Sequence, residues 1–575
     1  MNFDVSQVPF SRFGSYLAFS IVPPSWGHKG LLLRTVRIAG GLRELFRLAL
    51  LHGGREVPYT VTASPTLCRL ECRHGFVELC FAETDLVRLR GRGVTLRFLS
   101  ILDRGQYAFA IGPDRWQVNC AASSTQLLFI ALRGALGMDA PHDVHTQDAR
   151  RPSAPPDRPR VIADFIPDRA GRFDCAIHDF VTTPRRVDVS PSFDQSVRQV
   201  DAEWRRWLKT TPRVPARYAA AAELAMYVNW SATVAPAGLL RRPTMLMSKN
   251  WMTQCWSWDH CFNAIALSYR NPDLAWDQLM ALFDPQDSSG VLPDSIHAGG
   301  ASWNFCKPPI HGWALCKMLR NRRIRSPRRL KEIYPRLARW TNWWLRQRDN
   351  DRDGLPEYHH GNDSGWDNAT VFDAGFPLAG PDLSAFLVTQ MDALALLATR
   401  LARPREAQRW KARADTLLAR LLKRLWNGSQ FVSRKAFSGK VFPHGDCLLN
   451  FLPAVLGKRL PPAIRAALAA ALQPGGRFLT AHGPATENPR SPLYVPDGYW
   501  RGPIWGPTTV IIADGLARAG FPGLAKEIAR RYCDMCASTM AMAENYNALS
   551  GAPLRDKAYT WGSSSFLILA HELLA

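Results

Sequence analysis

The second part of this chain is a series of amphipathic segments, and this repetition restricts the fold more than any other feature of the sequence. About twelve segments after residue 215 repeat apolar residues at intervals of three and four, the spacing of one face of an α-helix. Paired helices of this kind can stack as an open solenoid or close into an (α/α)6 barrel. In a barrel, the loops at one end line a funnel, where functional sites concentrate.

The first part of the chain alternates polar and apolar residues, as β-strands do. Residues 76–81, 94–98 and 106–111 each place the two kinds of side chain on opposite faces. More strand-like sequence follows a proline-rich stretch at 150–160, which we therefore interpret as a loop inside one β-sandwich.

A length of 575 residues requires more than one hydrophobic core. We predict an antiparallel β-sandwich domain over residues 1–191, a linker helix over 192–214 and a helical catalytic domain over 215–575. Trp204 and Trp207, three residues apart, give the linker helix an apolar face.

The composition narrows the classes of partner. The chain is 46% hydrophobic and 21% charged, as globular proteins are, and it has no apolar run of membrane-spanning length. Its first residues lack the basic and apolar regions of a secretory signal, so we expect a cytoplasmic protein. The net charge of +23 comes from arginines spread along the chain, which solvated helix faces explain. We expect neither a nucleic-acid nor a membrane partner, and the oligomeric state is left open.

Three short segments of the helical part combine acidic and aromatic residues. They are GNDSGWDN at 361–368, YWRGPIW at 499–505 and ENYN at 544–547. Two carboxyl groups held among Trp rings suit cleavage of a glycosidic bond, because one protonates the leaving oxygen and the other activates water. Taken alone, Asp367 would be a turn residue and Glu544 a surface residue.

In this order, the three segments resemble the glycoside hydrolase clan of trehalases and processing α-glucosidases, most closely family 63. The resemblance runs from about Trp251 to the C-terminus. It implies an (α/α)6 barrel rather than a solenoid. It also implies that Asp367 is the general acid and Glu544 the general base, with Asp363 as the rival acid within the first segment.

The resemblance further implies a set of sugar-binding residues. Asp259 would accept hydrogen bonds from sugar hydroxyls, although its place at the start of a helix also suits the helix dipole. Aromatic faces would pack against pyranose rings, and an Arg would reach hydroxyls or fix a carboxylate. The predicted substrate-binding residues are Trp258, Asp259, Lys307, His311, Trp313, Glu357, Asp363, Trp366, Trp500, Arg501, Trp505 and Tyr546.

Two members of this set carry an alternative. Relatives often have Gln in place of Lys307, and a cation here could suit an anionic aglycone, the group released with the sugar. Trp313 fits core packing equally well.

A candidate metal loop lies between these segments. Asp349, Asp351 and Asp353 precede Gly354 with the spacing of a calcium loop, but His360 stands where the last Glu ligand is expected. The alternatives are a structural calcium ion, which some relatives hold, and a solvated turn. No other cofactor is expected.

The sequence thus predicts an inverting, exo-acting α-glycosidase, foremost an α-glucosidase. Its substrate would be a small carbohydrate, such as a disaccharide or a glucosylated metabolite. The alternatives are a trehalase or an inverting disaccharide phosphorylase on the same barrel, and an inactive carbohydrate-binding relative.

Overall fold

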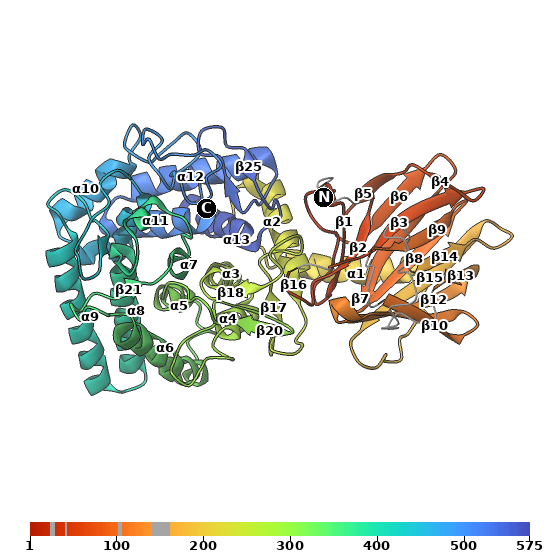
Figure 1. Cartoon of the computed structure of the whole chain (residues 1–575), viewed down its shortest axis with the longest axis horizontal. Coiled ribbons are helices and arrows are strands. Elements are labelled where there is room, and N and C mark those ends of the chain that lie inside the picture. Colours follow the sequence, from red (N-terminus) through yellow and green to blue (C-terminus); the bar gives the residue numbers. More distant parts are fainter. Residues whose placement is uncertain (24–28, 41–42, 102–105, 141–160) are drawn as a thin grey trace, which may run out of the picture.

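The computed structural model has two domains joined by one helix (Figure 1). It describes residues 1–23, 29–40, 43–101, 106–140 and 161–575. An antiparallel β-sandwich forms the N-terminal domain, and a barrel of helices forms the C-terminal domain.

The sandwich consists of two antiparallel sheets. The first has the order β1-β2-β3-β9-β14-β13, with β4 paired to β3. Its strands are β1 (Leu17–Ser20), β2 (Leu32–Thr35), β3 (Glu44–His52), β4 (Arg55–Val57), β9 (Thr95–Ser100), β13 (Ala135–Asp139) and β14 (Ile162–Ile166). The second has the order β10-β11-β12-β15-β8-β7-β6-β5. Its strands are β5 (Thr60–Ala63), β6 (Cys68–Cys72), β7 (Gly75–Glu83), β8 (Leu86–Arg92), β10 (Gln106–Gly112), β11 (Arg115–Cys120), β12 (Thr125–Arg133) and β15 (Arg172–Phe180).

Apolar residues on the facing sides of the two sheets form the sandwich core. Phe98 of the first sheet lies 5.4 Å from Phe129 of the second, measured between ring centroids, and both rings are buried. This is the inward-facing half of the alternation seen in the sequence. The proline-rich stretch at 150–160 lies outside the described residues.

Helix α1 (Phe193–Leu208) links the two domains. Ser192 caps its first turn by accepting a hydrogen bond from the Gln195 amide at 3.2 Å. Trp207 donates from its indole to the carbonyl of Met226 at 2.9 Å. Trp204 packs edge-on to Trp230 of the next helix, so the apolar face of α1 is buried against the barrel.

In the second domain, outer and inner helices alternate along the chain. The outer helices are α2 (Ala219–Ala232), α4 (Pro272–Ala281), α6 (Pro327–Gln347), α9 (Pro404–Leu425), α10 (Pro462–Leu472) and α12 (Pro522–Thr539). The inner ones are α3 (Asp259–Ser268), α5 (His311–Met318), α8 (Pro381–Arg400), η5 (Leu448–Arg459), α11 (Gly506–Ala519) and α13 (Thr560–Leu569). Each inner helix packs against the next, and α13 packs against α3, which closes the ring into an (α/α)6 barrel.

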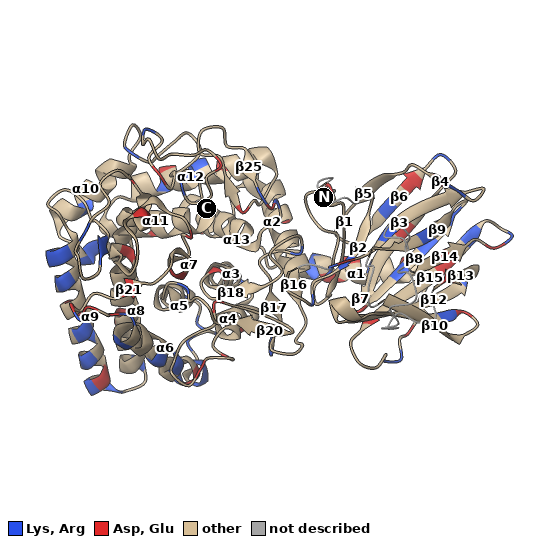
Figure 2. Ribbon diagram, viewed as in Figure 1, with Lys and Arg blue, Asp and Glu red and all other residues tan. Residues whose placement is uncertain are grey.

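Burial separates the two rings. The outer helix α9 buries Trp410, Ala414, Leu417 and Leu421, which follow each other at intervals of three and four. Its exposed positions are rich in Arg and Lys, which colour the ribbon of α9 at the edge of the barrel (Figure 2). The inner helix α8 is long and apolar enough to cross a membrane by composition, but 72% of its apolar window is buried within the barrel.

Candidate active site

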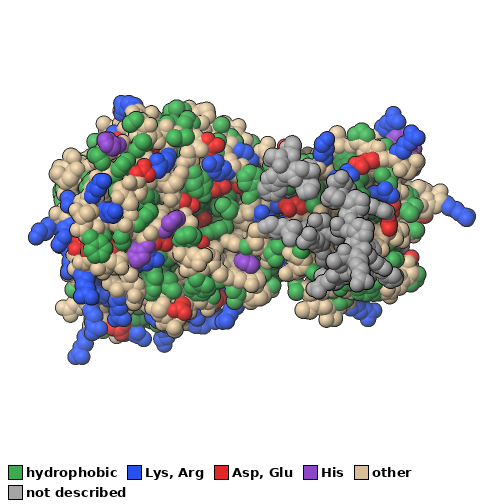
Figure 3. All heavy atoms as spheres, viewed as in Figure 1, with side chains coloured by type: hydrophobic (Ala, Val, Ile, Leu, Met, Phe, Trp, Pro, Cys, Tyr) green, Lys and Arg blue, Asp and Glu red, His purple; other side chains and the backbone are tan. Residues whose placement is uncertain are grey.

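A cavity of about 350 Å³ opens where the inner helices α3 and α13 begin. The barrel face in Figure 3 is hollowed near its centre, and acidic side chains lie in that hollow. Five of the predicted site residues line the cavity, namely Trp258, Asp259, Lys307, Asp367 and Trp500. Its wall also contains Asp294, Tyr499, Tyr559 and Trp561.

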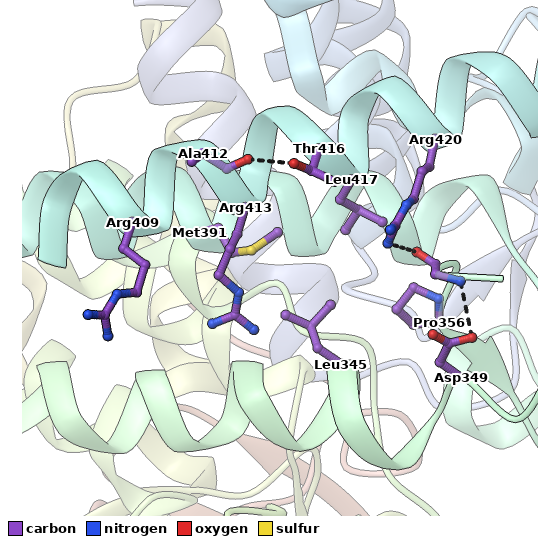
Figure 4. Close-up of a pocket in the computed structure, with 11 residues that line it drawn as sticks. Leu345, Asp349, Pro356, Met391, Arg409, Ala412, Arg413, Thr416, Leu417 and Arg420 are labelled. Atoms are coloured by element: carbon purple, nitrogen blue, oxygen red, sulfur yellow. Dashed lines mark hydrogen bonds between the residues drawn. The ribbon is translucent and has the colours of Figure 1, made fainter. Parts of the chain in front are cut away.

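A second cavity of about 380 Å³ lies between α6 and α9 (Figure 4). Arginines and apolar side chains line it. Of the site residues that we predicted, Asp349 is the one that lines this cavity. Because neither predicted catalytic carboxyl group reaches this cavity, we place the active site in the first one.

The 361–368 segment is shaped by two glycines. It begins as the short helix α7 (Gly361–Ser364), which ends at Gly365 in the left-handed conformation with φ of 72°. A Cβ atom at Gly365 would lie 2.5 Å from the Trp258 ring, and one at Gly361 would lie 1.8 Å from the carbonyl oxygen of Asp367. The turn that presents Asp367 to the cavity therefore requires glycine at both positions.

Asn368 ties this segment to the 499–505 segment. Its side chain donates to the Gly498 carbonyl at 3.0 Å and accepts from the Trp500 amide at 3.0 Å. Arg501 donates to the Asn368 carbonyl at 2.8 Å and pairs with Asp373. Arg501 thus braces the backbone beside Asp367 and does not line the cavity.

Asp367 shares the cavity with a buried lysine. The ammonium group of Lys307 lies 3.9 Å from an Asp367 oxygen and 3.3 Å from an Asp294 oxygen. It also donates to the Asn362 carbonyl at 2.7 Å. Burial acts to lower the pKa of Lys307, but Asp294, Asp367 and Asp259 together hold that pKa above its ordinary value. Lys307 is therefore engaged with carboxylates of the cavity wall.

Asp259 has the strongest signature of a sugar-binding acid. It is the first residue of α3 and 3% exposed, and burial raises its pKa well above the ordinary value, against the opposing charge of Lys307. Its Oδ2 atom has no hydrogen-bond partner in the part of the chain that the structure describes. A buried acceptor in the wall of a cavity is available to a sugar hydroxyl.

Glu544 lies behind the cavity wall. Its carboxyl group is 3% exposed and accepts a hydrogen bond from the Tyr499 hydroxyl at 3.3 Å. Burial raises the pKa of Glu544 to about 7, and the nearby Asp556 adds to that rise. Tyr499 holds a left-handed φ of 63°, the kind of backbone strain that concentrates at functional sites.

Tyr499 connects the two predicted catalytic groups. Its hydroxyl donates to Glu544, and it lines the same cavity as Asp367 and Asp259. Burial and the charges of Glu544, Asp367 and Asp259 raise the pKa of Tyr499 well above the ordinary value. Among the described residues, no hydrogen bond joins the two carboxyl groups directly.

A stack of indoles backs the cavity. Trp500 lies between Trp505, 3.8 Å away by ring centroids, and Trp366, 4.8 Å away. Only Trp500 of these three lines the cavity. Trp366 and Trp505 hold the Trp500 ring between them, and the contact with substrate that we predicted for them stays a prediction.

Three further residues of the predicted set are packed into the interior. Trp313 donates from its indole to Asp514 at 2.8 Å, and His311 packs against His260 and Trp340. Tyr546 donates to the Ala541 carbonyl at 2.6 Å, which shapes the loop of Glu544. Helix packing and loop closure bury these side chains, and they are not among the residues that line the cavity.

Glu357 and Asp363 are also held in structural hydrogen bonds. Asn350 donates to Glu357 at 2.6 Å. Asp363 accepts from the Cys306 amide at 3.1 Å and pairs with Arg348 at 2.8 Å. Neither side chain is among the residues that line the cavity.

The structure gathers Asp349, Asp351 and Asp353, whose ligand atoms lie within 4.8 Å of one another. Asp349 accepts the backbone amide of Gly354 within the turn at 3.3 Å, and Asp351 accepts that of Phe437 from a distant loop at 3.1 Å. Arg424 pairs with Asp353 at 3.2 Å and supplies positive charge. With a guanidinium among the carboxylates and no Glu ligand at its end, this donor set fits a solvated turn better than a calcium ion.

Sequence reasoning missed several residues of the wall. Tyr499 belongs to the 499–505 segment, from which we predicted Trp500, Arg501 and Trp505 as substrate-binding residues but not Tyr499. Tyr559 and Trp561 form an aromatic pair just where α13 begins, which was the available signal. The pairing of Asp294 with Lys307 joins two loops, and no local pattern reveals it.

Comparisons with known proteins identify the family of the helical domain. The model of the mannosylglycerate hydrolase MGH1-like glycoside hydrolase domain matches residues 252–562, more than half of the chain. Mannosylglycerate hydrolase MGH1 of Selaginella moellendorffii is 21% identical over 54% of this chain and 79% of its own length. Glucosylglycerate hydrolase of Mycolicibacterium hassiacum is 28% identical over 21% of this chain and 34% of its own length.

Two solved structures share the fold. The GH63 mannosylglycerate hydrolase of Thermus thermophilus, in complex with glucose, has a TM-score of 0.53 and 19% identity, covering 60% of this chain and 99% of its own. A bacterial glucoamylase complexed with acarbose has a TM-score of 0.57 and 12% identity, covering 100% of this chain and 96% of its own. The second likeness spans both domains of our structure.

Fold, site and comparisons together define the class of this protein: it is a glycoside hydrolase. Within that class, the chain belongs to the mannosylglycerate hydrolase MGH1-like glycoside hydrolase family. The predicted resemblance to family 63 and the predicted (α/α)6 barrel are both confirmed.

Proposed function

We propose that this protein is an inverting, exo-acting α-glycosidase that hydrolyses a small glycoside, with α-glucosides and α-mannosides of glycerate as its first candidate substrates. The observation that carries this proposal is that Asp367 lines a cavity of about 350 Å³ together with Tyr499, whose hydroxyl donates to Glu544. A cavity of this size holds roughly one or two sugar-sized units. The names of the MGH1 and glucosylglycerate relatives support glycerate as the aglycone.

In this mechanism Asp367 donates its proton to the glycosidic oxygen as the bond from that oxygen to the anomeric carbon breaks. Glu544 accepts a proton from a water molecule, whose oxygen bonds to the anomeric carbon from the opposite face. The products are a sugar with inverted configuration and the free aglycone. Exchange of protons with solvent then returns Asp367 and Glu544 to their starting states.

The remaining groups of the wall fit the binding of one terminal sugar. Trp258 offers apolar ring surface to a pyranose, and Asp259 offers its unpartnered oxygen to a hydroxyl. Trp500 contributes the edge of its ring, because Trp505 and Trp366 stack on its faces. The cavity volume of about 350 Å³ supports attack on a terminal sugar of a small glycoside over attack within a polymer.

The charges favour water over phosphate as the attacking group. A phosphorylase must hold a phosphate anion beside the sugar. Lys307 is the one Lys or Arg among the described residues that line the cavity, and it is engaged with Asp294. Glu544, by contrast, serves a reaction in which a neutral nucleophile must lose a proton.

A substrate panel tests this proposal. Glucosylglycerate, mannosylglycerate, trehalose and other α-linked glucose disaccharides would be incubated with the protein in phosphate-free buffer. We expect release of free sugar from at least one glycerate compound without added phosphate. Release that depends on phosphate would establish the phosphorylase, and turnover of trehalose alone would establish a trehalase.

A further inference from the structure

The polypeptide segment 248–253 connects the sandwich domain to the cavity. Its backbone turns back on itself, with the Ser248 amide donating to the Met252 carbonyl at 2.9 Å. Met252 itself and Gln254, just after the segment, line the cavity. Any displacement of this segment therefore moves the cavity wall.

Lys249 fixes the segment to the sandwich domain. Its ammonium group is 2% exposed and donates to the Ser15 carbonyl at 2.6 Å and to the Ser11 hydroxyl at 3.0 Å. A further contact reaches the Arg12 carbonyl at 3.4 Å. All these acceptors are neutral and belong to the N-terminal domain, so this buried cation takes its position from the sandwich.

Two arginines of the sandwich hold the same segment from another side. Arg34 donates to the Asn250 carbonyl at 2.7 Å and to the Lys249 carbonyl at 3.2 Å. Arg43 donates to the Trp251 carbonyl at 2.6 Å. The backbone of the segment is thereby bonded to the sheet that contains β2 and β3.

The segment in turn holds Asp556, which contacts the predicted base. Asn250 donates from its side chain to one Asp556 oxygen at 3.0 Å, and the Ser248 hydroxyl donates to the other. The backbone carbonyl of Asp556 accepts the amide of Glu544 at 2.7 Å. An unbroken series of hydrogen bonds therefore runs from Arg34 to Glu544.

We infer that the β-sandwich is a working part of the active site: through Arg34, Asn250 and Asp556 it sets the position of Glu544 and of the cavity wall at Met252. Asp556 is then a positioning residue, and the sandwich is more than a support for the barrel. The inference rests on the proposed function, in which Glu544 activates water.

The charges around Glu544 give this role a distinct readout. Asp556, Arg555, Tyr499 and Tyr559 are the titratable groups that face it. Asp556 helps to raise the pKa of Glu544, so its replacement by a neutral side chain lowers that pKa. Because a general base works when ionised, the acidic limb of the kcat/KM profile should then move to lower pH.

The test uses the full chain with three variants. Asp556→Asn keeps the shape of the side chain and removes its charge, and Arg34→Met removes the donors to the segment. Arg88→Met is the matched control, because Arg88 is also 2% exposed in the sandwich but binds Asp174 and the Pro191 carbonyl instead. Activity against pH and melting temperature are measured for each.

We expect the acidic limb of Asp556→Asn to move to lower pH, and kcat of Arg34→Met to fall about tenfold or more through misplacement of the base. Arg88→Met should lose melting temperature to a similar degree but keep the kcat and pH profile of the wild type. An unmoved profile in Asp556→Asn, together with an Arg34→Met variant that behaves like Arg88→Met, would overturn the inference. Full activity of Glu544→Gln would instead overturn the proposed function, so the two failures are distinguishable.

Discussion

The two predicted catalytic carboxyl groups occupy opposite kinds of environment. The side chain of Asp367 is 34% exposed, lies in the cavity wall and stands beside Lys307. Glu544 is 3% exposed, lies behind Tyr499 and has its pKa raised to about 7 by burial. In the proposed mechanism, Asp367 acts from a partly exposed loop and Glu544 from within the protein.

This difference teaches how the barrel can separate two proton transfers. The acid must reach the leaving oxygen at the mouth, where the aglycone departs, and an exposed loop permits that. The base must face a single water molecule on the closed side, and a buried position excludes bulk solvent from it. The anchors differ accordingly, because Asn368 ties the Asp367 loop within the barrel while Asp556 ties the Glu544 loop toward the sandwich.

The largest expected effect is loss of either carboxyl group. Asp367→Asn and Glu544→Gln should each lower kcat by about a thousandfold or more, because each removes one proton transfer in the transition state. Both variants should retain the melting temperature of the wild type within a few degrees. Near-normal turnover by either variant would show that another carboxyl group has the role assigned to it.

The next effect concerns the turn that presents Asp367. Gly365→Ala adds a Cβ atom 2.5 Å from the Trp258 ring at a residue with φ of 72°. We expect kcat to fall by roughly a hundredfold as Asp367 is displaced, with a lower melting temperature. Gly428→Ala is the matched control, since Gly428 also has a positive φ but nothing within 4 Å of its Cβ position. Equal losses of activity in both variants would contradict the special role of the turn.

A smaller effect follows from the environment of Glu544. The base is protonated and inactive below its pKa of about 7, so kcat/KM should rise as the pH rises through neutrality. The hydrogen bond from Tyr499 stabilises the ionised form, and Tyr499→Phe should therefore shift this limb to higher pH. The expected loss near neutral pH is roughly twofold to threefold. A shift of this limb to lower pH would show that the hydrogen bond from Tyr499 does not stabilise the ionised form of Glu544.

The smallest effect is expected at the acidic turn of Asp349, Asp351 and Asp353. Since Arg424 already supplies positive charge there, a chelator should leave the melting temperature unchanged. Thermal unfolding with and without added calcium measures this directly. A rise of several degrees with calcium would show a bound ion, because a ligand that binds only the folded state stabilises it.

Much of the fold was accessible from the sequence because it follows from periodicity. The strand predictions at 76–81 and 94–98 fall within or beside β7 and β9, and the helical spacing predicted the serial helices of the barrel. One expected helix is a 3-10 helix, η5, which is interrupted at Gly457 by a left-handed φ of 55°. Glycine and proline within that stretch were the signal for this difference.

The sequence predicted less well which side chains of the site face the cavity. Trp500 and Trp505 stand five residues apart in one segment, but only Trp500 lines the cavity. The spacing of aromatic residues does not reveal which ring lies in front. The contacts from Arg34 and Lys249 were equally hidden, because they join residues more than two hundred positions apart in the chain.

The most direct test of the account is the configuration of the sugar at the moment of release. Proton NMR during hydrolysis of an α-linked substrate should show the β-anomer appearing first, followed by slow mutarotation. That result requires water to attack from the face opposite the aglycone, between Asp367 and Glu544. First appearance of the α-anomer would mean retention, and the roles that we assign to the two carboxyl groups would be wrong.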